Sequence, residues 1–165
     1  MSECDVIEFS QIVIDNIIQV PFFPTPQQST YALTDDYAAG GTVVNTVLWL
    51  ANWGVRVRPA GSAIGTDWYG HLIINRLSVF KTIDTSFIDR FEDVHTPIVR
   101  CLIALNGERA FLAMTRVYPL PHYTITPDIL EGGRILSFGQ HAVNEAIPGL
   151  EHVREMGLVS AIGDI

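Results

Sequence analysis

Apolar residues recur along the chain at helical spacing in some stretches and in short β-branched runs in others. Residues 42–54 repeat apolar side chains every three or four positions, and Gly54 stands where a helix C-cap glycine belongs. Residues 68–80 repeat this pattern behind Asp67, which suits a helix N-cap rather than a catalytic group. Short runs of β-formers predict core strands near Val6, Val55, Ile135 and Val159.

The end of the chain supports a parallel sheet. A short helix is predicted over 126–131, with Pro127 at its first position. A buried strand over 134–140, a helix over 148–156 and a strand over 158–165 follow, which is the spacing of a βαβ unit. We therefore expect an α/β fold in which helices flank a parallel sheet.

A β-hairpin is the clearest local signal. Asn106-Gly107 lies between two runs rich in β-formers, residues 98–105 and 109–114. An Asn-Gly pair supplies the two positive φ angles of a type I′ turn, so we predict that turn here.

Composition narrows the classes of function. Eighteen acidic against ten basic residues give a net charge of −8 without a basic cluster, which argues against nucleic acid as a partner. No apolar run is long enough to span a bilayer and the N-terminus is acidic, so we expect a cytoplasmic protein that does not bind membranes. Cys4, Cys101 and the five histidines form no metal-ligand spacing. Neither a P-loop nor a Gly-x-Gly-x-x-Gly helix start occurs.

Asp15 is the first candidate for chemistry. It lies in the middle of 6–20, an apolar run that we interpret as one strand that turns and continues as a second. One interpretation is that Asp15 caps the bend between the strands by bonding to nearby backbone N–H groups. The other is that its carboxylate binds a ligand.

Gly40-Gly41 leads directly into the first predicted helix. Two glycines permit positive φ and let backbone approach a ligand at the helix start, where N–H groups are free. Asn45, four residues past Gly41, would face back toward this turn. A tight turn before an ordinary core helix is the alternative. Gln140 is a weaker candidate, at the carboxyl end of its strand where α/β sheets bind ligands.

The run over 40–77 resembles the N-terminal signature of the ribokinase-like (PfkB) family of carbohydrate and nucleoside kinases. The resemblance rests on an ordered series: the glycine pair, Asn45, a helix ending in Trp53-Gly54, a strand ending in Gly61, and Gly65-x-Asp67-x-x-Gly70 before another helix. It implies that Asp15, Gly40, Gly41 and Asn45, with Gln140, bind the acceptor sugar or nucleoside. It also implies a small β lid over about 15–37 and 96–116, with strands near Ile17, Tyr31, Val99 and Phe111.

The catalytic part of the signature is missing. In this family the base is an aspartate in a Gly-Ala-Gly-Asp-like turn, and no Gly-x-Gly-Asp occurs in the chain. We therefore expect residues 1–165 to be the N-terminal part of a ribokinase-like domain, without the nucleotide-binding half. ATP and Mg²⁺ are expected for the full-length enzyme and neither for this part. The alternative is a non-catalytic sugar- or nucleoside-binding module, or one that forms a homodimer through its lid.

Overall fold

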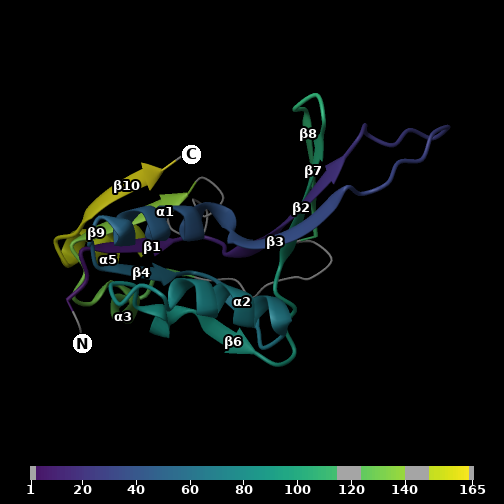
Figure 1. The fold of residues 1–165 in the computed structure, drawn as a ribbon. Helices are drawn as coiled ribbons and strands as arrows, with labels where there is room; N and C mark the ends of the chain where they lie inside the picture. Colours follow the sequence, from purple (N-terminus) through teal and green to yellow (C-terminus); the bar gives the residue numbers. More distant parts are fainter. Residues whose placement is uncertain (1–2, 115–123, 140–148, 164–165) are drawn as a thin grey trace.

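The computed structural model describes residues 3–114, 124–139 and 149–163, and its core is a four-stranded parallel sheet (Figure 1). The strand order is β10-β9-β1-β4, and every neighbouring pair is parallel. The strands are β1 (Val6–Phe9), β4 (Val57–Ala60), β9 (Ile135–Gly139) and β10 (Val159–Gly163). The predicted parallel α/β core is confirmed, although β4 begins at Val57 rather than at Val55.

Helices cover the two faces of this sheet. Helix α1 (Gly41–Asn52) and helix α2 (Trp68–Leu77) share one apolar core with Val6 and Val57. The opposite face of β1 carries Ile7, which packs in a second core together with residues of α3 (Pro127–Leu130) and α5 (Leu150–Glu155). Successive residues of β1 thus face opposite layers, as the pleat of a strand requires. None of the helices in the described part of the chain is long and apolar enough to cross a membrane.

A second four-stranded sheet projects from the core (Figure 1). Its order is β3-β2-β7-β8, with β2 (Val13–Val20), β3 (Thr34–Gly40), β7 (Ile98–Ala104) and β8 (Arg109–Ala113). We call these four strands the lid sheet. The prediction of a strand near Tyr31 is wrong, because Tyr31 lies outside any strand. Strand β3 begins at Thr34 and leads directly into α1. The sequence of β3 does not indicate a strand, because most of its residues are polar or small and exposed.

The β7–β8 hairpin is confirmed, but its turn is not type I′. Gly107 donates to the Ala104 carbonyl at 2.9 Å, and Ala104 donates to the Glu108 carbonyl at 3.0 Å. Gly107 has φ +88°, whereas no non-glycine residue among those described has positive φ. The loop therefore resembles a type I turn followed by a glycine bulge. Asn106 uses its side-chain oxygen to accept from the Glu108 N–H at 3.1 Å.

The segment between α2 and the lid sheet has more structure than its polar sequence suggested. It contains the short 3₁₀ helix η1 (Thr85–Phe87) and β6 (Asp89–Phe91), which pairs in parallel with β5 (Ala63–Gly65). Asp67 caps α2, as predicted, by accepting from the Gly70 N–H at 2.8 Å. The same carboxylate accepts from the backbone and hydroxyl of Thr96, at 3.0 and 2.7 Å. Asp67 thereby ties α2 to the segment that enters β7.

Candidate functional site

Asp15 lies within β2, where it pairs with Ala38 of β3 and Val99 of β7. The chain changes direction earlier, at residues 10–12 between β1 and β2. The interpretation of Asp15 as the cap of that bend is therefore wrong. Its half-buried side chain instead belongs to the part of the lid sheet closest to the start of α1.

Gly40 leaves the space that the Asp15 carboxylate occupies. A Cβ atom on Gly40 would lie 1.9 Å from Asp15 Oδ2, closer than any side chain permits. Gly41 is required for a different reason, because its φ is +85° and its Cβ would lie 2.8 Å from the Gln11 carbonyl oxygen. The structure thus brings three of the predicted site residues, Asp15, Gly40 and Gly41, into one arrangement.

The charge state of Asp15 reflects this environment. Burial raises the pKa of its carboxyl group above the ordinary range, and hydrogen bonding from the Gly41 backbone offsets part of the increase. The start of a helix favours a negative charge, which acts in the same direction as that hydrogen bond. The carboxylate oxygens are suited to accepting hydrogen bonds from hydroxyl groups.

The carboxyl ends of two core strands lie beside this arrangement. A Cβ on Gly139, the last residue of β9, would lie 3.3 Å from Ser10 Oγ and 3.4 Å from Thr42 Cγ2. Ser10 follows β1, and Thr42 is in the first turn of α1. Ligands of open α/β sheets bind at this edge. Gln140 follows Gly139 and lies outside the described residues.

Asn45 is placed differently from the other candidates. It lies one helical turn beyond Gly41 on the exposed side of α1, and its side chain lines a groove with Trp49 and Arg76. Within the described ranges its amide forms no hydrogen bond, with Asp15 or with any other residue. Its role in ligand binding stays a prediction.

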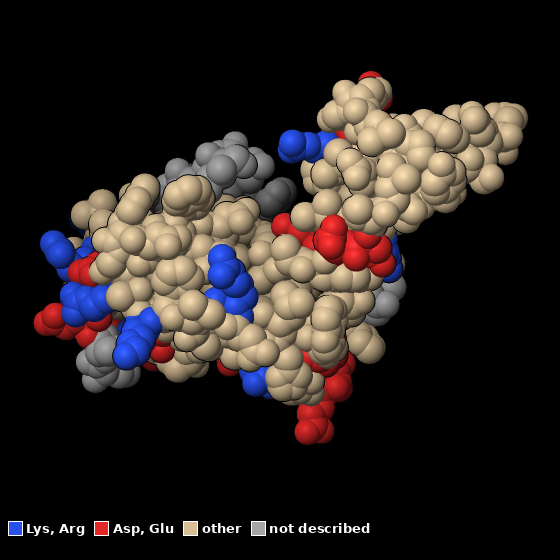
Figure 2. Space-filling model, viewed as in Figure 1, with Lys and Arg blue, Asp and Glu red and all other residues tan. Residues whose placement is uncertain are grey.

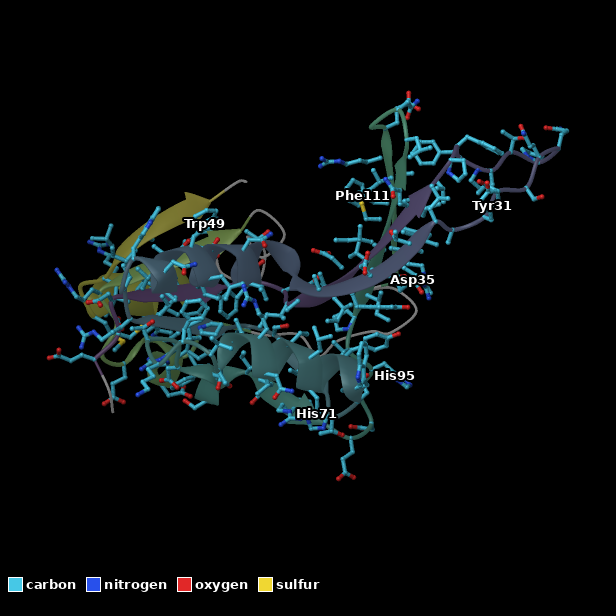
Figure 3. All side chains as sticks on the ribbon, viewed as in Figure 1. Tyr31, Asp35, Trp49, His71, His95 and Phe111 are labelled. Atoms are coloured by element: carbon cyan, nitrogen blue, oxygen red, sulfur yellow. The ribbon has the colours of Figure 1, made fainter. Side chains whose placement is uncertain are left out.

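A polar network around the buried side chain of Asn16, on the other face of β2, was not predicted. Asn16 is fully buried, donates to Asp35 Oδ1 and to the Asp36 carbonyl, and accepts from Arg100 Nη1. Figure 3 shows Asp35 where the lid sheet meets the core. Asn16 follows Asp15 directly, so this network fixes β2 and positions Asp15 on the opposite face. An asparagine among β-branched residues was the available sequence signal.

Aromatic rings join the lid sheet to α2 at the same place. The Tyr37 ring of β3 lies 5.8 Å from the Trp68 ring and 5.6 Å from the Tyr69 ring. Such pairs contribute about 0.5–1.5 kcal/mol beyond the area that they bury. The base of the lid sheet is therefore held by packing as well as by hydrogen bonds.

The described residues contain no group of three or more His, Cys, Asp or Glu side chains that could hold a metal ion. The sequence has no Gly-x-Gly-Asp turn either. No phosphoryl-transfer step follows from the groups that the structure places together.

No protein-family model and no curated protein sequence matches the chain. Solved structures do. Ribokinase from Arabidopsis thaliana, complexed with ribose and ATP, matches 98% of this chain and 53% of its own, with TM-score 0.79 and 14% identity. Ribokinase from Thermotoga maritima matches 96% and 52%, with TM-score 0.78 and 18% identity. Halothermothrix orenii fructokinase matches 96% and 56%, with TM-score 0.75 and 18% identity.

The chain therefore has the ribokinase-like fold, as the resemblance in its sequence indicated. It spans about half the length of each of these solved kinases. At such low identity the likeness establishes the architecture and leaves the reaction to be argued from the site.

Proposed function

We propose that this chain provides the acceptor-binding side of a ribokinase-like kinase, which transfers the ATP γ-phosphoryl group to a hydroxyl of a sugar or nucleoside. One observation supports this most strongly: the Asp15 carboxylate lies against Gly40, beside the start of α1 and the carboxyl ends of the core strands. Ribokinase from Arabidopsis thaliana was solved with ribose and ATP, and a relative from Cryptococcus neoformans with ADP.

In this proposal Asp15 accepts hydrogen bonds from acceptor hydroxyls. The backbone at Gly40 and Gly41 approaches the ligand closely, and Asn45 and Gln140 complete the polar contacts. ATP and Mg²⁺ bind to a nucleotide-binding half outside residues 1–165, which also supplies the base. The chain alone therefore binds an acceptor without phosphorylating it.

Calorimetric titration of ribose, fructose and adenosine tests the proposal. At least one should bind the unmodified chain, and Asp15→Ala should weaken that binding about tenfold or more, because a hydrogen bond to a charged group contributes about 1.5–3 kcal/mol. Asp89→Ala is the matched control, since Asp89 is an exposed aspartate of β6, outside the lid sheet. Equal losses in the two variants would contradict a specific role for Asp15.

The alternative function is a module that pairs through its lid sheet. The observation that favours it is the exposure of large apolar side chains on this sheet and its hairpin, namely Leu105, Phe111 and Leu112. Figure 3 shows Phe111 on the projecting part, away from the core. Apolar surface of this kind marks interaction sites.

A further inference from the structure

Helix α1 and the C-cap residue that follows it present two tryptophans, Trp49 and Trp53, to solvent. Trp49 is 63% exposed and Trp53 is 72% exposed, and their rings lie 6.3 Å apart at an angle of 43°. Figure 3 shows Trp49 on this helix, remote from the lid sheet. Tryptophan is usually highly buried, so a neighbouring pair of exposed tryptophans indicates a surface that binds a ligand or a partner. Trp68, the remaining tryptophan, packs against Tyr37 and Tyr69.

A groove of about 210 Å³ adjoins the pair. Trp49 lines it together with Asn45, Leu48 and Asn52 of α1 and Arg76 of α2. Asn52 donates to the Leu48 carbonyl at 2.9 Å, which leaves its side-chain oxygen as an acceptor. In the described part of the chain Arg76 forms neither an ion pair nor a side-chain hydrogen bond. The groove thus joins the exposed side chain of Trp49 to a guanidinium group that is available to a ligand.

The charge of the groove selects an anion. Helix α1 contains no charged residue, and Arg76 is the one charged residue among those that line the cavity. The whole chain carries a net charge of −8, so a positive groove without carboxylates stands out. Figure 2 shows an uncharged surface over α1, with blue atoms on the side that faces α2.

We propose that this groove binds a small ring compound that carries a phosphate group. The ring stacks on the indole of Trp49, the phosphate pairs with Arg76, and the amide of Asn52 binds a ring substituent. Indoles stack on both nucleobases and sugar rings, and guanidinium groups bind phosphate through paired hydrogen bonds. A nucleotide and a sugar phosphate share this chemistry. Asp15 is not among the residues that line the groove, and the proposal rests on Trp49, Asn52 and Arg76 rather than on the kinase function.

The three tryptophans allow a direct test by NMR. The indole N–H signals of the ¹⁵N-labelled chain are followed during titration with AMP and, separately, with ribose 5-phosphate; adenosine, ribose and inorganic phosphate serve as partial ligands. The Trp49 signal should shift with a phosphorylated compound, while the Trp68 signal stays fixed. Stronger binding of AMP identifies a nucleotide site, and stronger binding of ribose 5-phosphate identifies a sugar phosphate site.

Substitution of the guanidinium group completes the test. Arg76→Gln should weaken binding of the better phosphorylated ligand about tenfold or more, because it removes a charge-assisted contact. Arg109→Gln is the matched control, since Arg109 is an exposed arginine of the lid sheet, and it should leave the affinity unchanged. The proposal is overturned if neither ligand shifts the Trp49 signal, if Trp68 shifts to the same extent, or if Arg76→Gln binds normally.

Discussion

Position 40 must be glycine because a side chain there would clash with Asp15, and not because of its backbone conformation. Its φ of −146° is open to any residue, but a Cβ would lie 1.9 Å from Asp15 Oδ2. Gly40→Ala should therefore displace the carboxylate and reduce acceptor binding to the level of Asp15→Ala, as measured by calorimetry. Gly54→Ala is the control, because its Cβ meets no atom within 4 Å, and its φ of +79° costs stability at a distance from Asp15. Unchanged affinity in Gly40→Ala would contradict the proposed site.

Glu8 is a carboxyl group enclosed in the core sheet. It is 1% exposed, and its Oε2 atom has no hydrogen-bond partner among the described residues. Burial raises the pKa of Glu8 to about 7, and a hydrogen bond with Ser137 offsets part of the increase. Because the folded state holds this proton more tightly than the unfolded chain, stability should fall as pH rises from about 4.5 to about 7.

Glu8→Gln should remove that loss. At pH 8 the variant should be more stable than the unmodified chain by up to about 3 kcal/mol, since each unit of pKa shift corresponds to about 1.4 kcal/mol. At pH 4 the two should be nearly equal. Chemical unfolding at both pH values gives the comparison. A difference that does not change with pH would show that Glu8 does not titrate in this range.

At the scale of elements, the two glycines before α2 and within its first turn are explained by close backbone packing. A Cβ on Gly70 would lie 1.9 Å from the Gly65 carbonyl oxygen, which is backbone and unable to move away. Gly70→Ala should destabilise the chain by about 3 kcal/mol or more, the upper range for overpacking. Thermal unfolding measures the loss. Asn75→Ala, an exposed position of the same helix, should change stability little; if it were equally damaging, the backbone contact would not be the cause.

Elements with a clear local pattern of β-forming residues, or of apolar residues at helical spacing, were predictable. The strands of the core sheet, α1, α2 and the hairpin all follow from apolar spacing and from glycine or Asn-Gly positions. Strand β3 was not, because its neighbours in β2 decide its conformation while its own residues are polar or small. Tertiary pairing of this kind overrides local preference.

Part of the candidate site, namely the residues Asp15, Gly40 and Gly41, could also be predicted from the sequence. Asp15, Gly40 and Gly41 were found because an acid in an apolar run and a glycine pair before a helix are unusual locally. The contact between Asp15 and Gly40 joins positions 25 residues apart in the sequence. The steric reason for the glycine therefore could not be predicted from the sequence and is seen only in the structure. The Asn16–Arg100 hydrogen bond joins positions 84 apart and was missed for the same reason.

For the whole molecule, we proposed that residues 1–165 bind the acceptor and that the nucleotide binds elsewhere. This predicts that the chain alone consumes no ATP. An acceptor site without a nucleotide site positions a hydroxyl group but leaves no phosphoryl group to transfer. An ATP-consumption assay with a panel of sugars and nucleosides should give the background rate. Phosphorylated product from the purified 165-residue chain would contradict this proposal, provided that Asp15→Ala abolishes its formation and so excludes a contaminating kinase.

The alternative function predicts self-association through one particular face of the lid sheet. Phe111 pairs with Cys101, on the face that carries Asp15, whereas Leu112 pairs with Arg100, on the opposite face. If the Asp15 face receives the acceptor, a second copy must cover the other face. Leu112→Lys should therefore convert a dimer to a monomer, because each copy would bury a new cation beside Arg100. Phe111→Lys should leave the dimer intact.

Light scattering after size-exclusion chromatography measures the masses of both variants. A monomeric unmodified chain at high concentration would refute association, and loss of the dimer in Phe111→Lys alone would place the contact on the Asp15 face and leave no room there for an acceptor.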